Sequence, residues 1–174
     1  MIKTVSALSH HSMSISTEGG SSAKVKFMDR QAAIVLIIRD TNVVKFPVGY
    51  EREILTVTNR RFGTLVLPGG KTEPGETPIQ TAIRELQEEV SVVVEPPHLH
   101  FIGSSVNVVE GMADREVFLY LATQTWGKPT NVEEGTEIYW RSFNQFAEES
   151  FFSAYYKRHL PEGIDHLPST RMMG

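Results

Sequence analysis

Three glutamates lie close together in the stretch Gly70–Val92. A helix turns by about 100° per residue, so it would place Glu85, Glu88 and Glu89 on one arc roughly 100° wide. Carboxylates this close repel one another unless a positive charge lies between them. Oxygen ligands with open positions are what Mg²⁺ or Mn²⁺ prefers when the ion also holds substrate phosphates. The spacing therefore predicts a metal site for cutting a phosphate chain, with a solvated helix face as the alternative.

The residues before these glutamates predict where their helix begins. Thr77 can cap the helix, Pro78 suits its first position, and Gln80 completes a capping box. Apolar residues at helical spacing then predict one face that packs into a core: Ile79, Ala82, Ile83, Leu86 and Val90.

The whole stretch resembles the Nudix box, whose pattern is G-x5-E-x7-R-E-U-x-E-E-x-G-U with U a bulky aliphatic residue. Gly70, Glu76 and the run Arg84–Val92 match every defined position except one. Ser91 stands where the family has glycine, at a point where a left-handed backbone can be needed. The serine therefore affects how the helix is expected to end more than it affects the expected metal chemistry.

Nudix proteins have an α/β/α sandwich fold with a mixed sheet, and they use Mg²⁺ to hydrolyse a nucleoside diphosphate linked to another group. The resemblance implies that Glu88 and Glu89 bind the metal, for which Mn²⁺ is a possible substitute. Glu85 would be either a further ligand or the base that orients and deprotonates water. Glu76 and Arg84 would form the ion pair that fixes the loop against the helix.

Two further metal contacts follow from the same resemblance. A backbone carbonyl near Gly70 would contact the metal. Family members often add an acidic ligand from beyond the box, and Glu134–Trp140 is similar to the E-G-x4-W stretch of bacterial antimutator members. Glu134 is therefore the candidate ligand, with Glu133 and Glu137 as rivals and exposed loop glutamates as the plain alternative.

Substrate choice depends on residues outside the box. The stretch Phe146–Phe152 is similar to the W-P-D-D-S-Y-W stretch with which animal oxidised-purine triphosphatases recognise the base. The ring of Phe146 would stack on a purine, and Glu148 and Glu149 would hydrogen-bond to it. The alternative is an ordinary amphipathic helix start. The proline and tyrosine that mark family members acting on ADP-ribose or dinucleoside polyphosphates are missing.

Two arginines are further candidates for substrate binding. Arg60 and Arg61 precede the strand that leads into the box, and they could contact triphosphate oxygens or form a solvated hairpin tip. We therefore expect a pyrophosphohydrolase that cuts a nucleoside triphosphate, such as 8-oxo-dGTP, to a monophosphate and pyrophosphate in nucleotide-pool sanitation. The alternatives are hydrolysis of a nucleotide sugar, dinucleoside polyphosphate or capped RNA, and a non-catalytic nucleotide-binding module.

Composition limits the partners of the chain. A length of 174 residues suits one domain, and a formal charge of −4 argues against a general nucleic-acid binder. The absence of cysteine excludes thiolate metal sites and cysteine nucleophiles, and the run Ala32–Ile38 is too short to span a bilayer. We expect a cytoplasmic monomer or homodimer with a small-molecule nucleotide substrate, and we leave organelle import open.

The elements that must position the site form an α/β fold. Residues 1–26 are predicted as a disordered tail, with a transit peptide as the alternative, residues 27–161 as the Nudix domain, and residues 162–174 as a loose tail. A helix is predicted over Gln145–Leu160 and a loop over Trp126–Thr136. Strands are predicted at Gln31–Arg39, Glu53–Asn59, Thr64–Leu67, Leu99–Val109, Glu116–Thr123 and Glu137–Phe143.

Overall fold

The computed structural model describes residues 3–5, 30–44, 50–59, 63–108, 114–130, 136–150 and 152–174. Its helices are α2 (Pro78–Val90), α3 (Phe143–Glu149), α4 (Ser153–His159) and a 3₁₀ turn at Pro96–His98. Its strands are β1 (Lys3–Val5), β2 (Gln31–Leu36), β3 (Ile38–Val44), β4 (Tyr50–Asn59), β5 (Thr64–Val66), β6 (Gly69–Lys71), β7 (Leu99–Val108), β8 (Arg115–Ala122), β9 (Gln124–Trp126), β10 (Ile138–Ser142) and β11 (Arg171–Met173).

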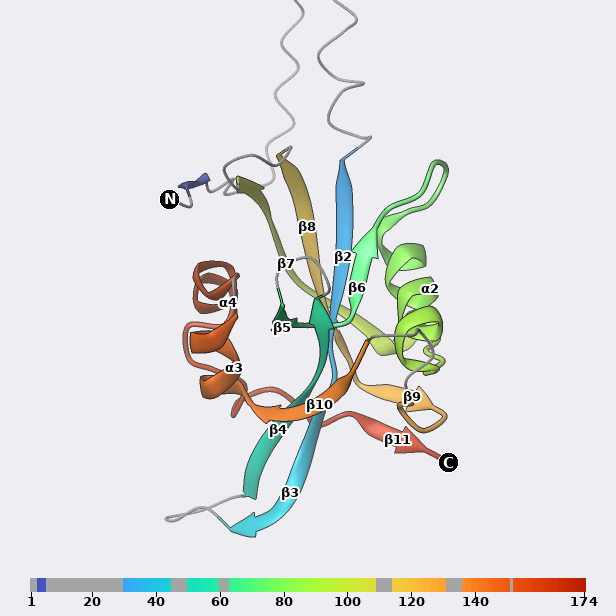
Figure 1. The fold of residues 1–174 in the computed structure, drawn as a ribbon. Coiled ribbons are helices and arrows are strands. Elements are labelled where there is room, and N and C mark those ends of the chain that lie inside the picture. The colour runs from blue at the N-terminus through green and yellow to red at the C-terminus, as the bar shows by residue number, and fades with distance from the viewer. Residues whose placement is uncertain are drawn as a thin grey trace, which may run out of the picture.

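A five-stranded sheet with the order β1-β7-β8-β2-β6 forms the centre of the fold. It is mixed, because β2 and β8 run parallel while β6, β7 and β1 join antiparallel. A second sheet has the order β10-β4-β3, with β5 paired to β4. Helix α2 lies on one side of these strands and helices α3 and α4 lie on the other (Figure 1). The expected α/β/α arrangement with a mixed sheet is confirmed.

Two groups of buried apolar side chains hold the layers together. On one face of the sheet, Leu86 and Val90 of α2 pack with Val35 of β2, and all three are fully buried. On the other face, Phe146 and Tyr156 of α3 and α4 pack over the strands. Each such side chain stabilises the fold by about 1.5–3 kcal/mol when it leaves water, so both helical layers are firmly anchored.

The predicted strand Gln31–Arg39 is divided between two sheets. β2 pairs with β6 and β8, whereas β3 pairs with β4, and the chain passes from one sheet to the other at Ile37. A continuous apolar run does not reveal this division, because both halves are buried. The predicted loop from Trp126 begins inside β9, which pairs in parallel with β11.

The predicted helix Gln145–Leu160 is two shorter helices. Helix α3 ends at Glu149. Its C-cap Ser150 has an extended backbone, and the Ser150 hydroxyl accepts a hydrogen bond from the Phe152 N–H at 3.2 Å. A serine side chain that bonds to a nearby N–H offers the backbone an alternative to the helix, and α4 begins again at Ser153.

Residues 162–174 are ordered against the sheet, so the prediction of a loose C-terminal tail is wrong. Arg52 donates hydrogen bonds to the Ile164 carbonyl at 2.8 Å and to the Ser169 hydroxyl at 3.0 Å. Buried Thr170 bonds through its backbone N–H to the Ile38 carbonyl at 2.7 Å. These partners lie more than 100 residues apart in sequence, so local pattern gave no sign of them.

The N-terminal segment is described only in part. Within residues 1–26, predicted as a disordered tail, Lys3–Val5 form β1 and pair antiparallel with β7. The rest of that segment lies outside the described residues.

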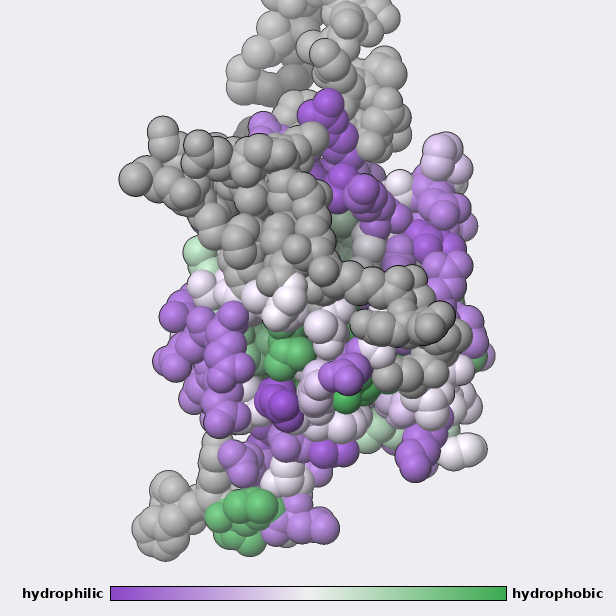
Figure 2. Space-filling view, in the orientation of Figure 1, coloured by the Kyte–Doolittle hydropathy of each residue, from purple (hydrophilic) through white to green (hydrophobic). Residues whose placement is uncertain are grey.

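The surface of the described residues is mostly hydrophilic in the view of Figure 2, with an apolar patch over the end of β3. Val43 and Val44 are exposed there, to 56% and 72%. This patch lies at the far end of β3 from α2 (Figures 1 and 2), so it takes no part in the site below. None of the described helices is long and apolar enough to cross a membrane.

Candidate active site

Helix α2 begins as its sequence predicts. Thr77 is the N-cap, its hydroxyl accepts a hydrogen bond from the Gln80 N–H at 3.4 Å, and the Gln80 side chain accepts one from the Thr77 N–H at 2.8 Å. Pro78 occupies the first helical position. A cap of this kind stabilises a helix by about 1 kcal/mol, and here it fixes the helix register that aims the glutamates.

Strand β6 is fitted closely against both β2 and α2. A Cβ at Gly69 would overlap the Ala33 backbone, and one at Gly70 would overlap the Glu85 carboxylate. The Gly69 N–H also donates a hydrogen bond to Glu89 at 2.8 Å. The two glycines therefore let the carboxylates of α2 lie directly over the backbone of β6.

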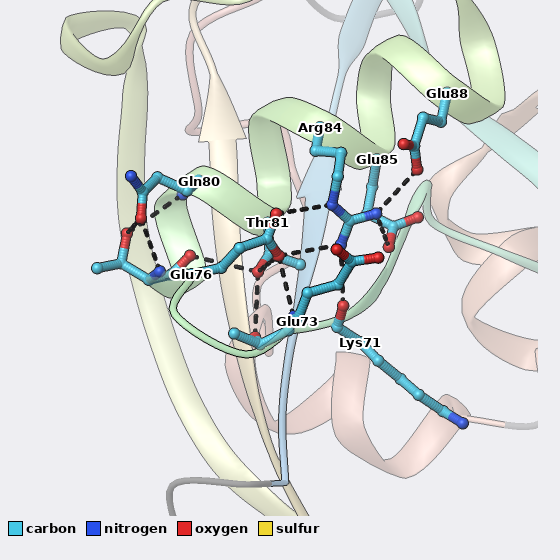
Figure 3. A network of polar contacts seen from close by, with 10 residues as sticks. Lys71, Glu73, Glu76, Gln80, Thr81, Arg84, Glu85 and Glu88 are labelled. Atoms are coloured by element: carbon cyan, nitrogen blue, oxygen red, sulfur yellow. Dashed lines mark hydrogen bonds and ion pairs between the residues drawn. The ribbon is translucent and has the colours of Figure 1, made fainter.

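Arg84 lies at the centre of a polar network with three glutamates (Figure 3). Its guanidinium donates to Glu76 at 2.7 Å, to Glu85 at 2.9 Å and to Glu88 at 2.8 Å. It also donates to the Lys71 carbonyl at 3.0 Å, which connects β6 to the helix. The ion pair expected between Glu76 and Arg84 is present, and it ties the loop after β6 to α2.

The network separates the protonation behaviour of its carboxylates. Hydrogen bonds from Arg84 above all, and from the Glu73 N–H and the Thr81 hydroxyl, lower the pKa of Glu76 from 4.5 to about 2. Burial raises the pKa of Glu85 despite the charge of Arg84. Glu76 is thus a permanent anion at neutral pH, whereas Glu85 is the carboxylate that takes up a proton more readily.

Sequence reasoning missed Thr81 and the Lys71 carbonyl. The Thr81 hydroxyl is fully buried and bonds to Glu76 at 3.0 Å and to Thr72 at 3.1 Å. A threonine on the apolar side of a helix is a weak signal for such a bond, because it also suits an ordinary core position. The carbonyl of Lys71 leaves no signal in the sequence at all.

The donor set fits a divalent cation. Glu85, Glu88 and Glu89 supply only carboxylate oxygens, and the Glu85 carboxylate lies directly against the Gly70 backbone. In the described part of the chain, however, no three acidic or histidine side chains lie close enough together to hold one metal ion between them. The reason is visible in the contacts, since Arg84 holds two of the carboxylates and the Gly69 N–H holds the third. A cation would replace contacts that these side chains already make to positive groups.

Ser91 adopts the left-handed conformation that its position in the pattern suggests. Its φ of 58° is the sole positive value among the described residues other than glycine, and its N–H bonds to the Leu86 carbonyl. An L-residue there costs about 1–2 kcal/mol, which explains why glycine suits this position. The helix nevertheless ends as expected, so Ser91 leaves the placement of the glutamates intact.

Phe146 does not have the position expected of a base-stacking residue, which is a correction to the prediction. Its side chain has 0% exposure and packs against the ring of Tyr156 at 4.7 Å, because it anchors α3 to the sheet. Glu148 and Glu149 are exposed on α3, on the other side of the sheet from α2 (Figure 1). The candidates Arg60, Arg61 and Glu134 lie outside the described residues.

Comparison with known proteins gives the same family as the sequence pattern. Residues 28–160 match the model of the NUDIX domain. No curated protein sequence matches the chain.

Solved structures with a similar fold include two bacterial MutT proteins. A MutT NUDIX hydrolase from Burkholderia pseudomallei is 21% identical, with a TM-score of 0.54, over 66% of this chain and 84% of that one. The MutT protein from Bacillus halodurans is also 21% identical, with a TM-score of 0.57, over 81% of this chain and 85% of that one.

A eukaryotic structure shares the fold as well. An Ap4A hydrolase from C. elegans is 17% identical, with a TM-score of 0.56, over 76% of this chain and 96% of that one. Identities this low establish the fold alone, whereas the domain match covers most of the chain. The chain therefore belongs to the Nudix family.

Proposed function

We propose that this chain is a Mg²⁺-dependent pyrophosphohydrolase that cuts a nucleoside triphosphate to a monophosphate and pyrophosphate. Nudix hydrolases generally use divalent metal ions and act on small nucleotide substrates. The observation that carries the proposal is the gathering of three carboxylates beside β6: Glu85 lies against Gly70, Glu89 accepts a hydrogen bond from the Gly69 N–H, and Glu88 shares Arg84 with Glu85.

Each residue of the site has a proposed role. Glu88, Glu89 and the Gly70 carbonyl would hold the metal, together with the expected ligand Glu134. A bound divalent cation would neutralise phosphate charge and make water more acidic. Arg84 holds Glu76 and the Lys71 carbonyl, so it keeps the loop and β6 in place against α2.

Glu85 is the carboxylate best suited to move a proton. Burial raises its pKa, so this carboxylate is more basic than a solvated glutamate. Arg84 lies 2.9 Å from it and limits its orientation. We therefore assign to Glu85 the orientation and deprotonation of the attacking water. Glu76 cannot take this role, because its pKa of about 2 makes it a weak base.

A second substrate class comes from the structural comparison. The C. elegans protein that shares the fold is named as an Ap4A hydrolase, so a dinucleoside polyphosphate is the alternative substrate. A preference for oxidised purines loses its main support, because Phe146 is buried in the core. The proposal therefore specifies the phosphate chain and leaves the base open.

A substrate panel tests the proposed function. Nucleoside triphosphates, dinucleoside polyphosphates and nucleotide sugars are incubated with the protein and Mg²⁺ or Mn²⁺, and pyrophosphate and phosphate release are measured separately. We expect metal-dependent release of pyrophosphate from a triphosphate. Turnover confined to nucleotide sugars, or no metal-dependent turnover of any compound, would contradict the proposal.

A further inference from the structure

Thr81 is a fully buried polar residue at a position that the Nudix pattern leaves undefined, between Glu76 and Arg84. Its hydroxyl lies 3.0 Å from the Glu76 carboxylate (Figure 3). The Thr72 hydroxyl is 3.1 Å away and the Thr77 carbonyl is 3.3 Å away. Oxygens on three sides therefore surround a group that can donate only one hydrogen.

The charge of Glu76 decides where this hydrogen points. Glu76 is ionised at neutral pH because its pKa is about 2, and an ionised carboxylate can only accept. The Thr81 hydroxyl therefore donates to Glu76, and the Thr72 hydroxyl donates to Thr81. The Thr72 N–H donates to the Gln31 carbonyl at 2.9 Å, which ties this residue to the central sheet. The two hydroxyls thus form a one-way chain that ends on the carboxylate, and the first bond strengthens the second.

The Glu76 carboxylate is held from both the loop and the helix. One oxygen accepts from the Arg84 Nε at 2.7 Å. The other accepts from the Arg84 Nη2 at 3.1 Å, from the Glu73 N–H at 3.0 Å and from the Thr81 hydroxyl. Arg84 thus meets a carboxylate whose orientation is already set by a donor from the loop and a donor from α2.

All five N–H groups of Arg84 have an acceptor. Two bind the Glu76 carboxylate as a pair, and a third binds the Lys71 carbonyl at 3.0 Å. The two on Nη1 remain for Glu85 at 2.9 Å and Glu88 at 2.8 Å. Because the guanidinium is planar and rigid, fixing the edge that meets Glu76 also fixes the direction of the Nη1 hydrogens. A shift of Glu76 would therefore move the contacts of the proposed base and of a proposed metal ligand.

We infer that Thr81 is a positioning residue for the hydrolytic reaction, because its hydroxyl fixes the Glu76 carboxylate that in turn fixes Arg84. Thr81 acts through Arg84, which carries its effect to Glu85 and Glu88. This inference rests on the proposed function, since these two carboxylates are the proposed base and a proposed metal ligand. It adds a residue of this chain to a pattern that does not define one at this position.

Packing alone does not account for the hydroxyl of Thr81. A threonine inside a helix commonly bonds back to the carbonyl four residues earlier, but the Thr77 carbonyl is the most distant of the three oxygens. An apolar residue of the same shape would fill the position without bringing a polar group out of water. The bond to a charged carboxylate offsets that cost, so the hydroxyl and Glu76 stabilise each other.

The mobility of Arg84 tests the inference without any turnover. The hydrogen-exchange rate of the Arg84 Nε–H is measured by NMR on metal-free, arginine-labelled protein, and the signal is assigned by its absence from Arg84→Met. The variants are Thr81→Val, which keeps the shape without the hydroxyl, and Thr81→Ser, which keeps the hydroxyl. Thr56→Val is the matched control, because Thr56 is also fully buried and its hydroxyl donates to the Tyr139 carbonyl at 3.0 Å in the other sheet.

The expected result is specific to the hydroxyl at position 81. We expect the Arg84 Nε–H to exchange at least about 10-fold faster in Thr81→Val, and within about 2-fold of the unmodified rate in Thr81→Ser and Thr56→Val. An unchanged rate in Thr81→Val would overturn the inference. So would a rate raised equally by Thr56→Val or by Thr81→Ser, because the Thr81 hydroxyl would then not be the group that holds Arg84.

Thr72→Val protects the test against a folding failure of Thr81→Val. Thr72 is only half-buried and follows β6, so the loss of its hydroxyl leaves the core side of α2 untouched. We expect about 3-fold faster exchange of the Arg84 Nε–H, a smaller effect than at Thr81, because Thr72 acts through Thr81. If Thr81→Val does not fold, an unchanged rate in Thr72→Val would overturn the inference.

Steady-state kinetics then connect the position of Arg84 to the reaction, at a temperature well below the melting point of every variant. We expect Thr81→Val to lower kcat for a nucleoside triphosphate about 10-fold with little change in KM, and Thr81→Ser to restore kcat. Normal kcat in Thr81→Val would overturn the inference and leave the proposed function standing. Thr81-dependent exchange of Arg84 without hydrolysis of any nucleotide would contradict the proposed function and still support the contacts from Thr81 to Arg84.

Discussion

The two faces of the five-stranded sheet differ in which sign of charge is in excess. On the α2 side, the single guanidinium of Arg84 is shared by Glu76, Glu85 and Glu88, all within 3 Å. On the other side, Arg30 and Arg115 are neighbours without a carboxylate partner among the described residues. One side is therefore short of positive charge and the other is short of negative charge.

The largest expected effect comes from removing one carboxylate on the α2 side. Glu88 is 58% exposed, so Glu88→Gln should leave the fold unchanged. A metal ion supplies several kcal/mol of charge stabilisation in the transition state, so we expect kcat to fall by about 100-fold or more. The matched control is Glu95→Gln at another exposed glutamate, which should keep full activity. Near-normal kcat in Glu88→Gln would remove this residue from the mechanism.

The second prediction concerns the stability that Arg84 provides. Arg84→Met leaves three neighbouring carboxylates without their shared cation. The site is partly solvated, so we expect a loss of about 1–3 kcal/mol in the free energy of unfolding, measured with a chemical denaturant.

Arg39→Met provides the comparison, because Glu53 is the single described carboxylate that pairs with Arg39, whose guanidinium also lies over the Trp140 ring at 4.1 Å. Loss of this ion pair should lower the free energy of unfolding by less than about 1 kcal/mol. Mg²⁺ should raise the melting temperature of Arg84→Met by more than that of the unmodified chain. Equal unfolding free energies for Arg84→Met and the unmodified chain would show that the network does not stabilise α2.

The helix that carries the glutamates could be predicted well from the sequence, because its determinants are local. The Thr77–Gln80 capping box, Pro78 and the apolar spacing all lie within a few residues, and the structure has each of them in place. The spacing of the glutamates then follows from helix geometry.

Features that depend on distant pairing could not be predicted in the same way. The adjacency of Arg30 and Arg115 arises from a strand register that joins residues 85 positions apart, as Gln31 and Glu116 are. The docking of Thr170 on Ile38 and the burial of Phe146 likewise depend on the packed fold. An aromatic residue next to acids suits a binding helix and a core helix equally well, so the pattern alone could not decide between them.

The third prediction is a specific acid sensitivity on the α2 side. The pKa of Glu76 is depressed from 4.5 to about 2, mainly by Arg84. Its contribution to stability is therefore complete above pH 4.5 and is lost as the pH falls toward 2. In Glu76→Gln this loss should be absent, so its unfolding free energy should fall less between pH 5 and pH 3 than that of the unmodified chain. Parallel pH curves for the two proteins would contradict the assignment.

The smallest expected effect is at the end of α2. Ser91 has a φ of 58°, which glycine adopts without a side-chain penalty. Ser91→Gly should raise the free energy of unfolding by about 0.5–1 kcal/mol and leave kcat unchanged, because the residue does not touch the carboxylates. A destabilised Ser91→Gly protein would show that the serine makes a contact that outweighs its strain.

Metal binding in the absence of substrate tests the central claim most directly. Free Mn²⁺ is followed by electron paramagnetic resonance as the protein is added, for the unmodified chain, Glu88→Gln, Glu89→Gln and the control Glu95→Gln. We expect the unmodified chain and Glu95→Gln to bind Mn²⁺ and to release it to Mg²⁺, and the Glu88 and Glu89 variants to bind at least about 10-fold more weakly. Mn²⁺ that stays free, or that binds all four proteins equally, would contradict a metal site on α2.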